Sequence, residues 1–368
     1  MARRSWRVVP RGDDGDMPRS GEAEPTVELP YPPGWLDRLI DWIGRMPGSN
    51  VLYCLGLLVL QFGYLTALLW ANGTLAVGSV DLKLAFVVVV APYLLWVRFS
   101  LDRVAAAALD TFRPALTVGD ADLRRLRFEL TNLPARQTLI VTVVAVAVFF
   151  LNAVLSPNGI AQQYGPTLGA AVIAIGPVGL FTVAVVAVST FQAVHQLRMV
   201  ERIHGLVGKV DLLRAKPLYA FSRLAALTGA SFLLLTYYVG AVRPDLVSTS
   251  RALEALLVAM VPIATACFVL PLRGMHRRLA DEKDRALAQV ASRFEVVFER
   301  LHERVDREVL ADADKLKQQI DSLSAEHAVL EKVSTWPWEP QVLTGFVTTL
   351  LLPVLLWGVQ RVLERVGF

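Results

Sequence analysis

Long apolar runs alternate with charged segments along the chain, and this alternation predicts its main elements. Each run is close to the roughly 20 residues that cross a bilayer as a helix. We therefore expect an all-α, polytopic helical membrane protein with about seven spans. The runs cover residues 51–71, 82–97, 138–155, 168–193, 224–242, 252–272 and 342–362.

The charged segment at 276–334 contains neither Gly nor Pro and follows a different pattern. Its apolar side chains recur in a 3–4 alternation, which is typical of a coiled-coil seam, and a stutter at 305–313 interrupts it. A straight, upright helix of this length would end far from the bilayer that the last run must enter. Two paths remain, a helix lying along the membrane surface and an antiparallel hairpin. The stutter favours the second, so we expect a cytoplasmic, coiled-coil-like helical hairpin with its turn near 308–315. The expected association seam consists of Leu287, Val290, Phe294, Val297, Leu301, Leu316, Ile320, Leu323 and Leu330.

Arg and Lys are distributed unevenly between the two sides of the predicted spans. The N-terminal tail and the segment after the second run are rich in Arg, the segments after the fourth and sixth runs hold both Arg and Lys, and the other loops hold very few of either. Such a bias predicts a cytoplasmic N-terminus and a C-terminus outside. The net charge of +4 then reflects these loops and their contact with the anionic inner leaflet, so no nucleic-acid partner is expected. We expect a multi-pass protein of the bacterial inner (plasma) membrane.

These patterns divide the chain into five parts. A disordered cytoplasmic tail is expected first, because its hydrophobic content is low and its charges are scattered. A membrane domain of six spans with helical cytoplasmic loops forms the largest part. The expected boundaries are 1–32 for the tail, 33–47 for an interfacial amphipathic helix, 48–275 for the six-span domain, 276–334 for the helical insert, and 335–368 for a Trp-Pro linker with the final span.

Tryptophans occur just before the first predicted span and just before the last one. In the helix at 33–47 the apolar residues fall mainly on one face, and Asp37, Arg38 and Asp41 fall on the other. We expect this helix to lie in the lipid interface, and packing on the protein's own cytoplasmic side is the alternative. The residues expected as interfacial anchors are Trp35, Trp42, Trp336 and Trp338.

The fourth run contains the feature that most favours transport, and prolines in other runs add to it. Gly176, Pro177 and Gly179 predict a kink or break near mid-membrane, where broken helices can form a substrate site. A structural kink with tight helix packing is the alternative. Ionisable residues are nearly absent from the runs, and Arg98, which ends the second run, is expected to snorkel to the headgroups.

The chain contains no recognisable catalytic or metal-binding motif. His195, Glu201 and His204 lack the spacing that places three ligands on one helix face, so neither a metal nor a cofactor is expected. Cys54 and Cys267 both lie inside predicted spans, which disfavours a disulfide.

We therefore expect a non-enzymatic membrane protein. Its cytoplasmic helical module, 276–334, would mediate self-association into a homo-oligomer or docking of a protein partner, with signal relay as an extension of that role. The alternative is a channel or facilitator for a neutral or lipid-like solute, gated by the same module. An enzyme acting on lipids lacks residues that could be named for the chemistry.

Overall fold

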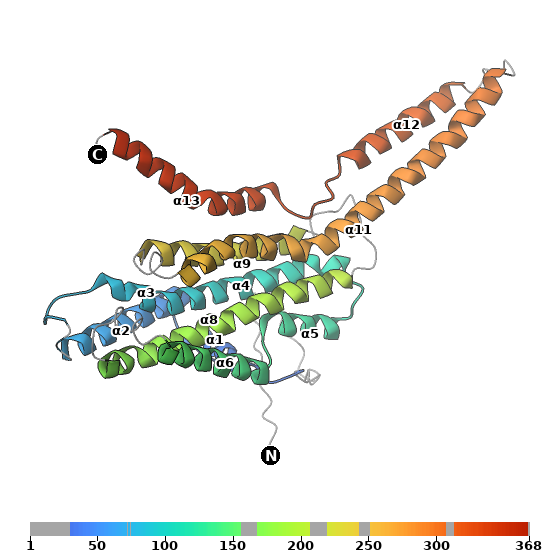
Figure 1. The fold of residues 1–368 in the computed structure, drawn as a ribbon. Helices are drawn as coiled ribbons and strands as arrows, with labels where there is room; N and C mark the ends of the chain where they lie inside the picture. Colours follow the sequence, from blue (N-terminus) through green and yellow to red (C-terminus); the bar gives the residue numbers. More distant parts are fainter. Residues whose placement is uncertain are drawn as a thin grey trace, which may run out of the picture.

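The computed structural model describes residues 30–71, 73, 75–155, 168–206, 219–242, 251–306 and 313–366. This part of the chain is helical and contains no β-strand, only an isolated bridge between Pro33 and Pro134. Figure 1 shows the helices in order along the chain. They are α1 (Trp35–Gly44), α2 (Asn50–Ala71), η1 (Leu82–Leu84), α3 (Ala85–Val88), α4 (Val90–Phe112), η2 (Arg113–Ala115), α5 (Asp120–Thr131), α6 (Ala135–Leu155), α8 (Leu168–Gly205), α9 (Ala220–Val242), α11 (Arg251–Asp306), α12 (Ala313–Lys332) and α13 (Pro340–Val366).

Five helical segments within the described ranges are long and apolar enough to cross a membrane. They contain all or most of the first, second, fourth, fifth and sixth predicted runs, while the third and seventh overlap shorter apolar helices at Ala135–Leu151 and Pro340–Pro353. The all-α, multi-pass fold predicted from the sequence is therefore confirmed. The five segments are Asn50–Ala71, Ala85–Ala115, Gly176–Gly205, Ala220–Val242 and Val258–Glu303.

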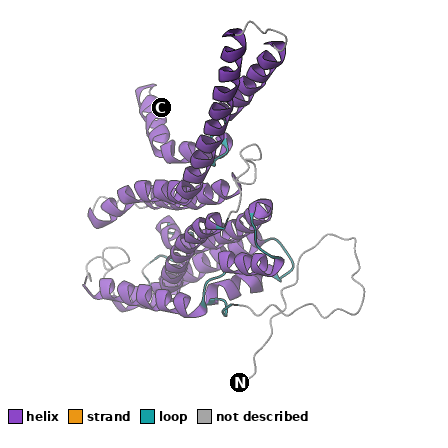
Figure 2. Cartoon of the chain, turned by 90° about the vertical axis from the view of Figure 1, so that its right-hand side faces the viewer, coloured by secondary structure: helices purple, strands orange, loops and turns teal. Residues whose placement is uncertain are grey.

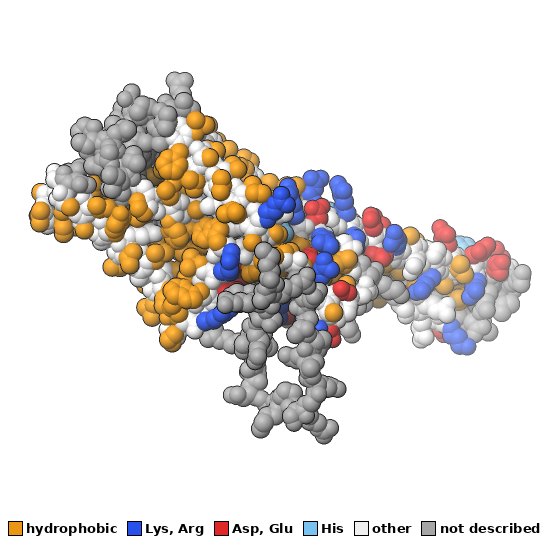
Figure 3. Space-filling view, turned by 90° about the horizontal axis from the view of Figure 1, so that it is seen from below, with side chains coloured by type: hydrophobic (Ala, Val, Ile, Leu, Met, Phe, Trp, Pro, Cys, Tyr) orange, Lys and Arg blue, Asp and Glu red, His pale blue; other side chains and the backbone are white. Residues whose placement is uncertain are grey.

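Helix α4 lies at the centre of the bundle and is its most buried helix. It packs against α8 and α9, and α9 packs in turn against α11 and α13. Large apolar side chains remain exposed on the outer helices, as at Val59 and Leu60 of α2 and Val143 of α6. Figure 3 shows hydrophobic side chains over one half of the viewed face and charged ones over the other half. This division is what a bundle with one half in lipid requires.

An arm extends from the charged end of the bundle. It consists of residues 276–306 of α11 together with α12, and Figures 1 and 2 show both helices projecting away from the other helices. Residues 333–339 then lead back to α13, which packs on α9. The hairpin with its turn near 308–315 stays a prediction, because residues 307–312 lie outside the described residues.

Helix α1 packs on the protein itself, which was the alternative reading of its sequence. Leu36 and Ile40 are buried in a cluster with residues of α2, α4 and α8, and Trp35 Nε1 donates a hydrogen bond to Thr142 Oγ1 at 2.9 Å. Asp37, expected on the polar face, is buried instead. Trp42 stays exposed and is free to reach lipid. The tail at 1–29 lies outside the described residues.

Candidate functional site

The predicted seam lies between the two helices of the arm. Val290, Val297, Leu316 and Leu330 are buried, and the other five seam residues are partly buried while most of their neighbours are exposed. Polar contacts hold the same two helices together. Lys283 Nζ donates to the carbonyl oxygens of Glu331 at 2.7 Å and Val333 at 3.0 Å, and Arg293 Nη1 lies 4.0 Å from Glu326 Oε2. Helices α11 and α12 therefore pack on each other within one chain, whereas the role of the seam and its knobs-into-holes packing stay predictions.

Apolar side chains also remain on the outside of the arm. Val296 and Phe298 of α11 and Val329 of α12 are exposed, and Phe298 exposes 43% of its surface. Phe298 lies between Phe294 and His302, with ring centroids 6.0 and 6.5 Å away. An exposed apolar group outside the bundle gains free energy when a partner covers it.

An aromatic column joins the base of the arm to the membrane helices. His276 stacks on Trp336 at 3.9 Å between centroids, and Trp336 stacks on Trp338 at 4.4 Å. Trp338 lies 5.7 Å from Phe268 of α11, which stacks at 4.5 Å on Phe346 of α13. The two tryptophans expected as interfacial anchors are thus partly buried in one stack, and His276 Nδ1 is 3.0 Å from the Thr335 carbonyl oxygen.

Helix α8 runs from Leu168 to Gly205 with Pro177 inside it, so the helix is not broken at the predicted kink. A Cβ built on Gly176 would meet no atom within 4 Å, whereas Gly179 is buried. Close helix packing is therefore absent at Gly176. A bend at Pro177 stays a prediction, and nothing here favours a substrate site at this position over a structural role.

The most buried charges in the described part of the chain meet where α1 crosses α4. Arg98 and Asp37 expose only 3% and 4% of their side chains, and Arg98 Nη2 lies 2.7 Å from Asp37 Oδ1. The same nitrogen donates to the Thr131 carbonyl oxygen at 2.6 Å. Asp37 Oδ2 accepts from the backbone N–H of Leu133 at 2.9 Å and of Gly34 at 3.3 Å. Arg98 is therefore an internal cation that fastens α1 and the end of α5 to α4, and the expectation that it snorkels to the headgroups is wrong.

A second carboxylate shares this arginine. Asp102, one helical turn after Arg98, places Oδ2 3.2 Å from Arg98 Nε, and its Oδ1 accepts from Gln196 Nε2 of α8 at 3.1 Å. The Arg98 Nε contact is short enough for an ion pair but lacks the alignment of a hydrogen bond. We call Asp37, Arg98, Asp102 and Gln196 the charge cluster.

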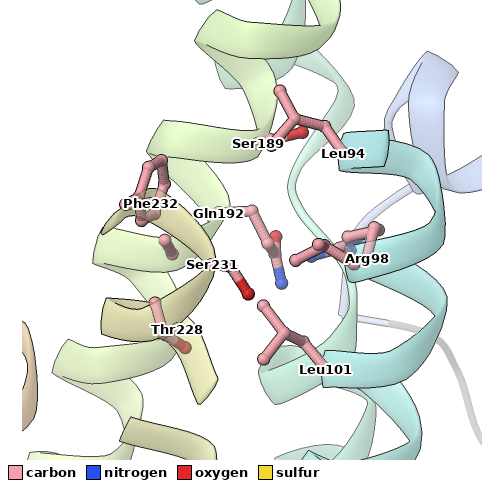
Figure 4. A pocket seen from close by; sticks show the side chains of 10 residues that line it. Leu94, Arg98, Leu101, Ser189, Gln192, Thr228, Ser231 and Phe232 are labelled. Carbon is pink, nitrogen blue, oxygen red and sulfur yellow. The ribbon is translucent and has the colours of Figure 1, made fainter. Parts of the chain in front are cut away.

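A small cavity adjoins the charge cluster, between α4, α8 and α9 (Figure 4). Its volume is about 20 Å³, room for roughly one water molecule. Arg98 Nη1, Gln192 Oε1 and Ser189 Oγ belong to residues that line it, and none of these three atoms has a hydrogen-bond partner. The cavity can hold a water that satisfies them, and it is too small for an organic solute.

A peripheral ion-pair group lies next to the cluster. Glu129 at the end of α5 accepts from Arg125 Nε at 2.9 Å and Arg202 Nη1 at 3.3 Å. Its carbonyl oxygen lies 2.9 Å from His195 Nε2. Burial first, and then the carboxylates of Glu129 and Asp37, raise the pKa of Tyr31, whose hydroxyl donates to the Asn132 carbonyl oxygen.

The histidines after the fourth run have separate partners. His195 contacts α5, whereas His204 is buried with Nδ1 3.3 Å from the Pro271 carbonyl oxygen and its ring 5.5 Å from Phe112 and Phe221. Among the described residues, no three His, Cys, Asp or Glu side chains form a group that could hold a metal ion.

Sequence reasoning missed the charge cluster, although two signals were present. Arg98 and Asp102 are four residues apart, and Ser189, Gln192 and Gln196 are separated by three and four residues. Both spacings place polar side chains on one face of a helix. A polar stripe on an otherwise apolar helix indicates that the stripe faces the interior of the protein.

Comparison of the chain with protein-family models, curated protein sequences and solved structures finds no match to any of the three. Its function is therefore argued from its own geometry.

Proposed function

We propose that this protein is a non-enzymatic, multi-pass protein of the bacterial inner membrane whose arm mediates docking, with a second copy of the chain as the partner. The observation that carries the proposal is that the seam is already filled within the arm, while Phe298 remains exposed outside it. Association must then use the outer surface of the arm rather than the seam. The sequence interpretation left open whether the seam pairs within or between chains, and the contacts above favour pairing within one chain.

The aromatic column supports the idea that such docking can reach the membrane helices. It connects His276, at the base of the arm, to Phe346 of α13 through consecutive ring contacts. Stacked rings at these distances resist sliding and tilting, because each displaced ring loses contact area with two neighbours. A partner bound to the arm would therefore act on a base that is fixed to α11 and α13. This geometry is what signal relay through the arm would require.

Docking predicts a specific effect of Phe298→Glu. We expect this substitution to weaken self-association of the full chain in lipid nanodiscs or detergent by about tenfold or more, because a buried interface aromatic commonly carries this much binding energy. Energy transfer between differently labelled copies, measured against protein concentration, gives the dissociation constant. Gln289→Glu adds the same charge at an exposed polar position of the same helix and should leave it unchanged.

Two results would contradict the proposal. If the wild-type chain stays monomeric at all concentrations, a second copy of the chain is not the partner. If the Phe298→Glu chain associates as well as the wild type, docking does not use this face of the arm. Helix content and melting of the arm are recorded in parallel, since Phe298 also contacts Phe294.

The proposed orientation places the arm in the cytoplasm and the loop before α3 outside. In a background without Cys54 and Cys267, a membrane-impermeant thiol reagent should label Ser79→Cys in intact cells. It should label Ser324→Cys only after the cells are permeabilised. Both positions are exposed, so accessibility depends on the side of the membrane. The opposite labelling pattern would reverse the topology, and the arm could then not meet a cytoplasmic partner.

A further inference from the structure

The charge cluster contains one more negative group than positive. Asp37 and Asp102 both lie against Arg98, at 2.7 and 3.2 Å, and no second cation is within ion-pair distance of either carboxylate among the described residues. An uncompensated charge in the protein interior is costly, because few dipoles replace the water that solvated it. The cluster becomes electrically neutral when one of its two carboxyl groups binds a proton.

The two carboxyl groups differ in the hydrogen bonds that stabilise their ionised forms. Asp37 accepts hydrogen bonds from Arg98 Nη2 and from two backbone N–H groups, which favours its charged form. Asp102 accepts one side-chain hydrogen bond, from Gln196 Nε2, and its contact with Arg98 Nε is poorly aligned. Asp102 keeps 21% of its side chain exposed, whereas Asp37 keeps only 4%.

The surrounding charges also favour binding of the proton by Asp102. Asp102 is influenced by Arg98 on its own helix and by Asp37 and Asp41 on α1, so acidic groups outnumber the single cation. Helix α8 contributes only the neutral Gln196. The neighbouring Glu129 has its own cations, Arg125 and Arg202. Among the described residues, Arg98 is therefore the one cation that offsets the negative charge of Asp102, and Arg98 is shared with Asp37.

Gln196 provides the partner that a protonated Asp102 needs. Its side chain is buried, Nε2 donates to Asp102 Oδ1, and Oε1 has no hydrogen-bond partner. An amide rotated by half a turn presents an acceptor in place of a donor at nearly the same position. We propose that Asp102 is a proton-binding site, and that proton uptake reverses the Gln196 amide so that Asp102 donates to Gln196 Oε1. One proton moves from a hydronium ion to Asp102 Oδ1, and the N–H···O hydrogen bond is replaced by an O–H···O bond.

Infrared difference spectroscopy of the full chain in lipid tests this site. The carbonyl stretch of a protonated carboxyl group should grow as pH falls through the mildly acidic range, and Asp102→Asn should abolish this band. Asp37→Asn should also suppress it: one arginine then faces one carboxylate, so protonation should need at least about tenfold more protons. Asp110→Asn, at an exposed carboxyl elsewhere on α4, should leave the band unchanged.

Gln196→Leu separates the proton site from the amide reversal. It should retain the band but shift its frequency, because the acid loses its hydrogen-bond acceptor. A wild-type chain without the band, or a band that survives Asp102→Asn, would overturn the proton site. An unshifted band in Gln196→Leu would overturn the reversal. If Asp37→Asn does not fold, Asp41→Asn must suppress the band in the same direction, and failure to do so would count against the charge argument.

Discussion

Replacement of Arg98 by Gln is expected to lower the free energy of unfolding by about 3–5 kcal/mol, the range for breaking a buried ion pair from one side. The guanidinium is almost fully buried, and it bonds Asp37 of α1 and the Thr131 carbonyl oxygen at the end of α5. Its loss leaves two carboxyl groups inside the protein without their shared cation. Denaturant titration in detergent or lipid, followed by helix content, measures the effect.

Two controls show whether this cost comes from the buried charges. Arg127→Gln removes an arginine whose partner Asp110 is also exposed, and we expect a change of at most about 1 kcal/mol. The double variant Arg98→Gln, Asp37→Asn removes one buried carboxylate as well and should regain part of the lost stability. A double variant as unstable as the sum of the two single ones would show that the ion pair contributes no coupling.

The helices could be predicted because their pattern is local. Apolar runs of the required length were sufficient to place α2, α8 and α9, and the 3–4 alternation identified Val290 and Leu316 as residues that lie buried between the two arm helices. Chain length alone excluded a straight, upright helix, since residues 335–341 had to return to the membrane, and the stutter at 305–313 then favoured a hairpin over a helix along the membrane surface. These inferences need only spacing and distance along the chain.

The charge cluster depends on long-range contacts and could not be predicted in the same way. An arginine at the end of an apolar run ordinarily reaches the headgroups. Whether it turns inward depends on Asp37, which is 61 residues earlier in the sequence. The aromatic column has a similar origin. Trp336 and Trp338 flank Pro337, and their stacked rings lie between His276 and Phe268, two residues of α11 that are distant in the sequence.

Gly229 lies at a close contact between membrane helices, and its replacement by Ala should destabilise the bundle. A Cβ at this position of α9 would lie 2.8 Å from the Ala264 carbonyl oxygen of α11 and 2.9 Å from Phe346 Cε2 of α13. The backbone oxygen cannot move without moving α11 itself. We expect Gly229→Ala to cost about 1–3 kcal/mol, the usual range for overpacking a close-packed interior.

Gly240→Ala is the matched control on the same helix, because a Cβ there meets no atom within 4 Å. Ala favours the helix over Gly by up to about 1 kcal/mol, so this variant should be neutral or slightly more stable. Melting of both variants in the same lipid, followed by helix content, gives the difference. Because Phe346 also ends the aromatic column, Gly229→Ala should in addition change the fluorescence of the stacked Trp338. Equal melting of the two variants would mean that α9 and α11 are not in the close contact on which the path from the arm to the membrane helices depends.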